Sequence, residues 1–476
     1  MRNLPERSCD RSVASSRDAD CTSDALDSYR VPERISPLRP SDRQAGSRTE
    51  SADSRLVSLI EPQLRERLAE TDGAPLTQRL LRLFDSIKPQ QFGDAFHLDD
   101  RKRAEFWHAK VQHQIEHDLP ANESQAWLKS LEKFDKRCKR DGVSDAERAE
   151  LFINTMRLMN AGEQSGGVKP CHFRPLAKTV LEQCSRSAHV SQGEHDDCTS
   201  ASIEGVLQTC SPGTYSRLVA DLALNGGFGR EGAVLYLPKQ CLEPDREARA
   251  TSRKHGERSF ASQLVQQFIG NLRWKNGGEL PDGTSALPGS VEYRPLHPGS
   301  NREFLFHDGK PVVTKHKDGK GHVRKSRIDY PSISDEEYLG LFETLAGSDK
   351  LVVVAHAKAV DTTKDASGRQ TVHAVKSAGQ LRKILERCTV HANGDENSTS
   401  HYQPIIIGVH TENKPFGDRR GKGGWHAAVL HDYNPKDGTV RMDVHWAPGD
   451  DFSGLKGQKR RLRVSEVFDA MKPPRH

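Results

Sequence analysis

Residues 191–200 read Ser-Gln-Gly-Glu-His-Asp-Asp-Cys-Thr-Ser and contain the cysteine on which the predicted fold depends. Apolar residues recur at helical spacing after it and predict an amphipathic helix that begins at Cys198, capped by Asp196 or Asp197. A thiol attacks only as the thiolate, and the positive end of a helix dipole favours that charged form. Cys198 is therefore the candidate nucleophile, although aspartates facing the sulfur would raise its pKa. A buried structural cysteine is the alternative.

A histidine far downstream is the candidate base. Residues 424–430 read Gly-Trp-His-Ala-Ala-Val-Leu and predict a strand that starts next to His426. A turn follows, and the return strand would bring Asp443 beside His426, where a carboxylate could orient the imidazole and select its tautomer. Asp432 and Asp450 are the other candidates for this third position. In the alternative reading, His426 only caps a strand and Asp443 faces solvent.

Gln192 lies six residues before Cys198 and could donate its amide N–H to an oxyanion, together with the Cys198 backbone N–H. The order Gln192, Cys198, His426, Asp443 resembles the papain-like cysteine protease superfamily. The resemblance implies an α+β fold of two lobes, a helical lobe with the nucleophile helix and an antiparallel β lobe. It also implies a Cys-His-Asp triad with a Gln oxyanion donor, and neither a metal nor a cofactor. Papain-like enzymes place an Asn two residues before a Trp, whereas Val444 holds that place before Trp446.

Three regions differ in composition. Residues 1–54 are rich in Ser, Arg and Asp with almost no apolar periodicity, which predicts a disordered leader. Residues 55–162 show helical periodicity and predict a helical N-terminal domain, and residues 168–476 would form the papain-like domain. Helices are predicted at 100–117, 122–138, 144–160, 174–187, 198–209, 212–224, 257–272, 376–388 and 464–471. Strands are predicted within 302–315, 320–329, 350–360, 403–410, 424–433 and 438–446.

Ser144 should cap the helix at 144–160, with Glu147 in the capping-box position three residues later. Trp107, Trp127 and Phe134 in the preceding helices are expected in the core.

Bulk properties limit the class of protein. The net charge of +5 over 476 residues is diffuse, so nucleic acid is not an expected partner. The densest basic run, residues 456–463, is read as a solvated surface strand. The nine cysteines contain no CxxC pair and suggest reduced thiols. An apolar run of ~18 residues is missing, as is an apolar N-terminal segment, so neither a membrane span nor a signal peptide is expected.

Other signals are weaker. His356 in an apolar strand is read as a core histidine, and His373 is followed by a helix instead of a return strand. Residues 417–424 lack phosphate-loop spacing and are read as a loop beside His426. Adjacent ligands such as those in 195–198 rarely close a metal shell.

Function stays open between several classes at this point. The same machinery serves peptide cleavage, deamidation, transglutamination and acyl transfer, and an inactive papain fold could serve as an interaction module. The leader and the fold resemble those of bacterial effectors, which implies a host protein as substrate and delivery into the host cytoplasm by a type III-like route. Without such delivery the expected location is the cytoplasm. The oligomeric state is not predicted.

Overall fold

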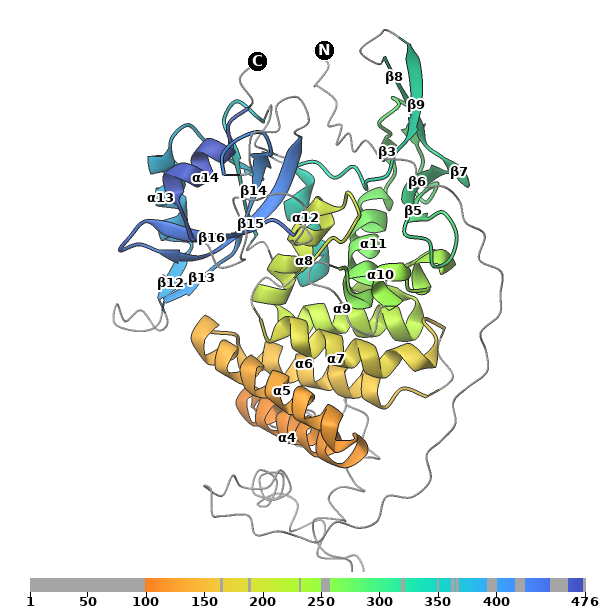
Figure 1. The fold of residues 1–476 in the computed structure, drawn as a ribbon, viewed down its shortest axis with the longest axis vertical. Helices are drawn as coiled ribbons and strands as arrows, with labels where there is room; N and C mark the ends of the chain where they lie inside the picture. The colour runs from red at the N-terminus through yellow and green to blue at the C-terminus, as the bar shows by residue number, and fades with distance from the viewer. Residues whose placement is uncertain are drawn as a thin grey trace, which may run out of the picture.

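Helices and a mixed sheet lie side by side in the computed structural model of this chain (Figure 1). In that view helices fill the centre and the lower half, the larger sheet lies at upper left, and small hairpins lie at upper right. The leader predicted at 1–54 lies outside the described residues. The structure describes residues 99–162, 166–186, 190–230, 233–249, 257–317, 322–348, 351–360, 364, 368–391, 400–415, 424–445 and 461–473.

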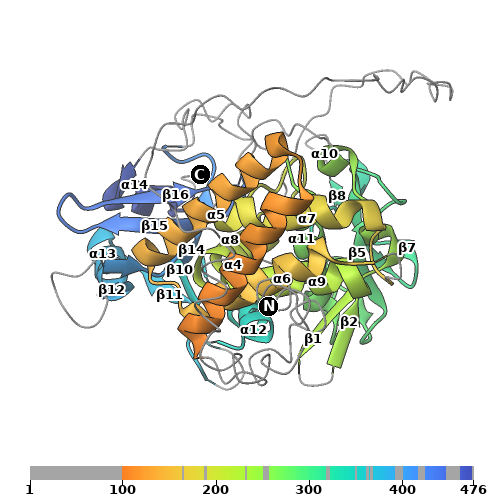
Figure 2. The same cartoon turned by 90° about the horizontal axis from the view of Figure 1, so that it is seen from below.

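Three long helices open the described chain: α4 (Asp100–Asp118), α5 (Ala121–Asp141) and α6 (Asp145–Met159). Their positions confirm the predicted helices, and Figure 2 shows α4 and α5 nearest to a viewer below the molecule. Trp127 and Phe134 are buried as predicted, and so is Trp107.

At the start of α6, the structure has the predicted Ser144 cap but not the predicted capping box. Ser144 Oγ accepts the Glu147 backbone N–H at 3.3 Å, which confirms the cap. The Glu147 carboxylate does not complete a capping box with Ser144. It accepts the backbone N–H groups of Gly213 and Thr214 at 2.6 and 3.2 Å, so it caps a later helix instead.

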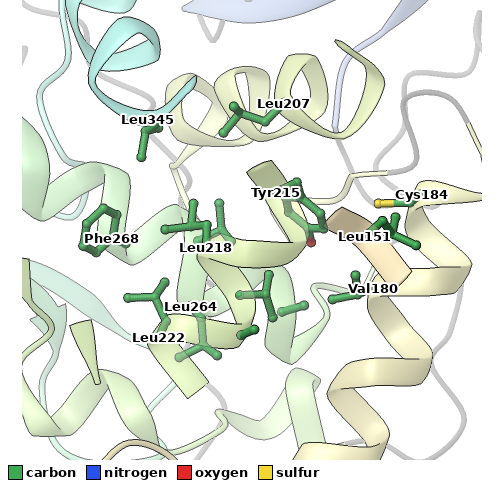
Figure 3. Close-up of a cluster of buried hydrophobic side chains, with 14 of the residues drawn as sticks. Leu151, Val180, Cys184, Leu207, Tyr215, Leu218, Leu222, Leu264, Phe268 and Leu345 are labelled. Atoms are coloured by element: carbon green, nitrogen blue, oxygen red, sulfur yellow. The ribbon is translucent and has the colours of Figure 1, made fainter. Parts of the chain in front are cut away.

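That later helix belongs to a second group, and one hydrophobic core joins both groups. Figure 3 shows part of this core, with Leu151 of α6 near Val180, Cys184 and Tyr215 of the second group. The predicted boundary between 162 and 168 thus falls within a continuous core, and the division into two domains stays a prediction. The helices of this group are α7 (Phe173–Cys184), α8 (Cys198–Cys210), α9 (Pro212–Asn225), α11 (Phe260–Trp274) and α12 (Glu337–Ala346).

Arg137 ties the first group to α8. Its buried guanidinium donates to the carbonyls of Gln208 and Thr209 at 2.9 and 2.7 Å. A cation at the C-terminal end of a helix complements the dipole there. The helix that carries Cys198 is therefore anchored at its far end.

The larger sheet has six strands in the order β11-β10-β14-β15-β16-β17. The β14-β15-β16-β17 part is antiparallel, as predicted, but β10 pairs in parallel with both β11 and β14. The prediction of an antiparallel β lobe is therefore wrong for this edge, because a parallel pair needs a crossover connection instead of a tight hairpin turn. The strands are β10 (Val352–His356), β11 (His373–Val375), β14 (Ile405–His410), β15 (Trp425–Asn434), β16 (Thr439–Asp443) and β17 (Arg461–Arg463).

Side chains alternate between the two faces of this sheet. Ala427 and Val429 of β15 belong to the core shared with α8 and α12. Ala428 and Leu430 belong to a second core, formed with α13 (Ala378–Arg387) and α14 (Val464–Ala470). This alternation decides on which face each candidate side chain lies.

Small elements complete the chain. His356 is buried against Phe468 of α14, as expected for a core histidine. Within the described residues, none of the helices is long and apolar enough to cross a membrane. The hairpins are β1 (Gly227–Arg230) with β2 (Ala233–Tyr236), β3 (Gly278–Glu279) with β4 (Ser285–Ala286), β8 (Val313–Lys317) with β9 (Val323–Arg327), and β12 (Thr389–His391) with β13 (Ser400–Tyr402). The rest are β5 (Val291–Pro295), β6 (Glu303–His307), β7 (Lys310–Pro311), η1 (Pro170–His172), η2 (Lys239–Leu242) and α10 (Arg246–Arg249).

Candidate functional site

Helix α8 begins at Cys198, as the sequence predicts. The Cys198 side chain is partly exposed and lies in the first turn, where the backbone N–H groups and the dipole favour a thiolate. Asp197 is the N-cap residue, but its side chain makes no capping hydrogen bond, so the predicted aspartate cap is wrong.

Asp197 is fully buried instead. Burial raises the pKa of its carboxyl well above the usual value, and the neighbouring Glu303 raises it further. The neutral acid is thereby favoured, and a neutral Asp197 does not oppose a charged sulfur on the next residue.

The other described cysteines differ from Cys198. Burial raises the pKa of Cys138 to about 12 and also raises the pKa values of Cys184, Cys241 and Cys388. Cys171 is exposed in η1, whereas Cys210 ends α8, where the dipole disfavours a negative charge. Among the described thiols, Cys198 thus combines exposure with a helix N-terminus.

His426 is the second residue of β15 and is buried. Its Nε2 lies 2.6 Å from the carbonyl oxygen of Val444. Because a carbonyl only accepts, Nε2 must carry the hydrogen and Nδ1 is the basic nitrogen. Burial lowers the pKa of His426 to about 3, despite the opposing effect of this bond, and the nearby His445 lowers it further. The ring is therefore a neutral imidazole, and in this buried position burial makes Nδ1 a weak base.

The residue that orients His426 is not the one predicted. Asp443 ends β16, and its Oδ1 accepts the His445 backbone N–H at 3.0 Å and lies 3.6 Å from His445 Nδ1. Asp443 pairs with Val429, which places it on the α8 face of the sheet. The orienting contact comes from the carbonyl of Val444, the residue at the position of the papain-like Asn.

Asp432 and Asp450 are the other candidates for the third position. Asp432 lies in β15, and Asp450 lies outside the described residues.

Helix α8, which carries the candidate nucleophile, packs directly against the strand of the candidate base. A Cβ added to Gly205 of α8 would lie 3.8 Å from Val429 Cγ2 and 3.3 Å from His445 Cε1. Helix α8 therefore covers the face of β15 that carries Ala427 and Val429. His426 pairs with Val409 and alternates to the other face, at the beginning of the strand. The structure brings the two elements together and directs the imidazole to the opposite face of β15.

Gln192 is buried and participates in the loop before α8. Its backbone N–H donates to the His445 carbonyl at 3.0 Å, and its side-chain Nε2 donates to the His195 carbonyl at 2.7 Å. The Gln192 side-chain amide, which was predicted to donate to an oxyanion, therefore donates within this loop and stabilises its conformation.

A buried ionic network beneath the same loop has no signal in the sequence. Arg258 Nη2 donates to Asp245 Oδ2 at 2.8 Å and also to Glu303 Oε1. Both ring nitrogens of His195 face these carboxylates, at 3.3 Å from Asp245 and 3.6 Å from Glu303. Burial alone would raise the pKa values of Asp245 and Glu303, but Arg258 and His195 lower both below their usual range. These residues are scattered over more than a hundred positions, so no local motif could reveal them.

His195, Asp245 and Glu303 could in principle offer ligands to a metal, since their ligand atoms lie within 4.8 Å of one another. The guanidinium of Arg258 already bonds to both carboxylates and supplies positive charge at that position. We therefore assign these residues to an ionic network.

His445 is a second residue that sequence reasoning missed. It is buried at a positive φ of 58°, and within the part of the chain that the structure describes its ring nitrogens have no hydrogen-bond partner. Its ring lies beside Gly205, which is seven residues along α8 from Cys198. At 1.5 Å per residue this is about 10 Å, too far for direct proton transfer in this conformation.

Comparisons with family models, with curated proteins and with solved structures find no match to this chain. The likeness to papain-like enzymes therefore depends on the residues and geometry described above.

Proposed function

We propose that this protein is a papain-like thiol hydrolase that attacks amide bonds, with Cys198 as the nucleophile and His426 as the base. The observation that carries the proposal is the position of Cys198, a partly exposed thiol in the first turn of a helix that packs against the strand of a neutral histidine. The Val444 carbonyl replaces Asp443 as the group that fixes the tautomer of His426.

The chemistry would follow from these groups. His426 Nδ1 takes the proton of Cys198, and the sulfur attacks the amide carbonyl to form a tetrahedral oxyanion. The amine leaves with the proton from His426, and a thioester remains on Cys198. Water, activated by the neutral ring, then releases the acid. For the first step the ring and the sulfur must meet at the beginning of β15, so a rotation of the His426 side chain around the strand end is part of the proposal. The rotation breaks the bond to the Val444 carbonyl, which fixes the tautomer only in the resting conformation, and it brings the ring out of the site where burial lowers its pKa.

An acceptor other than water would make the same thioester serve acyl transfer or transglutamination, and a Gln substrate would give deamidation. The substrate class that we propose is a protein, and delivery as a bacterial effector into a host cell is part of the same hypothesis. An inactive interaction module is the competing function.

Thiol reactivity tests the proposal. The full chain is alkylated with iodoacetamide across a pH series, and each cysteine is quantified by peptide mass spectrometry. We expect Cys198 to react at a lower pH than Cys171, which is exposed, and Cys210, at the other end of α8. The variant His426→Gln should shift the Cys198 profile upward and leave the Cys171 profile unchanged.

Equal profiles for all three thiols would refute the nucleophile and support an interaction module. If Cys198 is selectively reactive, incubation with a protein extract identifies the reaction. Cleaved peptides, Gln converted to Glu, or new cross-links distinguish the alternatives, and each should vanish in Cys198→Ser.

A further inference from the structure

The hairpin β8–β9 stands apart from the rest of the fold. Its two strands pair only with each other among the described strands, and Figure 1 shows them extending beyond the body at upper right. Backbone hydrogen bonds fix its base to β6. The Leu305 N–H donates to the Ile328 carbonyl at 2.9 Å, and the Val312 N–H donates to the Leu305 carbonyl at 2.8 Å. The ribbon is thus a firmly rooted projection.

The ribbon carries charge of one sign. Its two strands read Val-Thr-Lys-His-Lys and Val-Arg-Lys-Ser-Arg, without an acidic residue. Lys315 pairs directly with Lys325, and both are exposed. Like charges directly opposite each other destabilise a strand pair. Lysines that served only solubility would gain by having an acidic partner across the strands, so this arrangement points to an anionic partner.

The same face also carries apolar side chains. By the register, Val313 and Val323 lie on the face of Lys315, Lys325 and Arg327. Val313 is 37% exposed and Val323 is 62% exposed. A face that mixes exposed valines with lysines suits a surface that is both anionic and apolar just beneath its charges.

The positive face continues onto the body. The guanidinium carbons of Arg327 and Arg302 both lie 5.3 Å from the ring centroid of Phe304 in β6. The cations therefore extend from the ribbon to its root.

We propose that this face of the β8–β9 ribbon binds an anionic phospholipid membrane surface. The lysines and Arg327 pair with phosphate and carboxylate headgroups, and the two valines enter the headgroup boundary. Nucleic acid would use the cations alike, but it offers an apolar side chain only single thymine methyl groups and no continuous apolar layer beneath its charges. The surface is independent of the proposed hydrolase chemistry at Cys198.

Vesicle sedimentation of the full chain tests the proposal. We expect binding to phosphatidylcholine vesicles that contain phosphatidylserine, and far less to phosphatidylcholine alone. Each lysine near such a surface contributes roughly fivefold to partitioning, so Lys315→Gln with Lys325→Gln should weaken binding by about 25-fold. Val313→Ser with Val323→Ser should weaken it with the charge unchanged.

The matched control is Lys129→Gln with Lys133→Gln on the exposed side of α5, which removes the same charge elsewhere. This control should bind like the wild type. An equal loss in the control would overturn the proposal in favour of diffuse attraction. Binding to duplex DNA at least as tight as to the anionic vesicles would also overturn it.

Discussion

Replacing Arg258 with methionine should destabilise this protein by about 3–5 kcal/mol, the usual cost of removing one partner from a buried ion pair. The guanidinium is fully buried and donates to Asp245 and Glu303, which are also buried. Methionine fills most of the volume but removes the guanidinium from two buried carboxylates. Besides the His195 ring, these keep only neutral donors, Gln267 Nε2 at 2.6 Å from Glu303 and the Ala248 backbone N–H at 2.8 Å from Asp245. Urea unfolding followed by circular dichroism measures the loss.

The pH dependence of that loss identifies its cause. In the native chain the pKa values of Asp245 and Glu303 are below their unfolded values, so their ionisation stabilises the fold above about pH 4. That contribution is lost as the pH falls through the native pKa values. Without Arg258, burial should raise both pKa values, so the variant should lose less stability at pH 5 than at pH 8. A destabilisation that is the same at both pH values would mean lost packing alone and would refute the ionic explanation.

A matched arginine provides the control. Arg157 donates to Asp221 at 2.7 Å, but both side chains are about one-fifth exposed. Arg157→Met should therefore cost no more than about 1 kcal/mol. An equal cost at both sites would show that burial does not set the strength of these pairs.

Three further predictions concern single positions. Burial lowers the pKa of His426 to about 3, whereas an unfolded histidine has a pKa near 6.5. Below pH 6.5 the unfolded chain therefore binds one more proton, and the free energy of unfolding should fall by about 1.4 kcal/mol per pH unit. Acid titration of the unfolding free energy should show this slope, and His426→Gln should flatten it. Gly193→Ala should destabilise the fold by more than 1 kcal/mol, because φ is +64° and a Cβ would lie 2.0 Å from Glu247 Oε2; a thermal shift within error would contradict this. Ser144→Ala should cost about 1 kcal/mol by removing the α6 cap, measured by urea unfolding, whereas Glu147→Gln should weaken the cap on α9 without affecting Ser144.

Local patterns in the sequence predict the helices, whose positions depend on residues close to one another in the chain. Helical periodicity locates α4, α5 and α6 within a few residues, and the start of α8 at Cys198 is correct. The parallel pairing of β10 with β14 is not predictable in this way, because it joins segments about fifty residues apart and depends on the packing of the chain between them, which includes β11 and α13.

For a similar reason, the sequence does not predict which group contacts the His426 ring. Asp443 and Val444 are adjacent, and a strand turns adjacent residues to opposite faces. The hairpin prediction brings both residues near His426, but the face is set by the register, which the turn sequence alone does not determine. A backbone carbonyl can orient an imidazole as well as a side chain can, and no residue type signals it.

Hydrogen bonds to two adjacent backbone carbonyls also connect the two halves of the proposed site. Cys198 follows a loop in which the Gln192 N–H donates to the His445 carbonyl. The adjacent carbonyl, that of Val444, accepts the hydrogen of His426 Nε2. The loop before Cys198 is therefore hydrogen-bonded to the His445 carbonyl, and the carbonyl of the adjacent residue, Val444, holds the His426 ring. A displacement of either should move the other, so we expect a change in the ionic network under the loop to affect the proposed base as well as the proposed nucleophile.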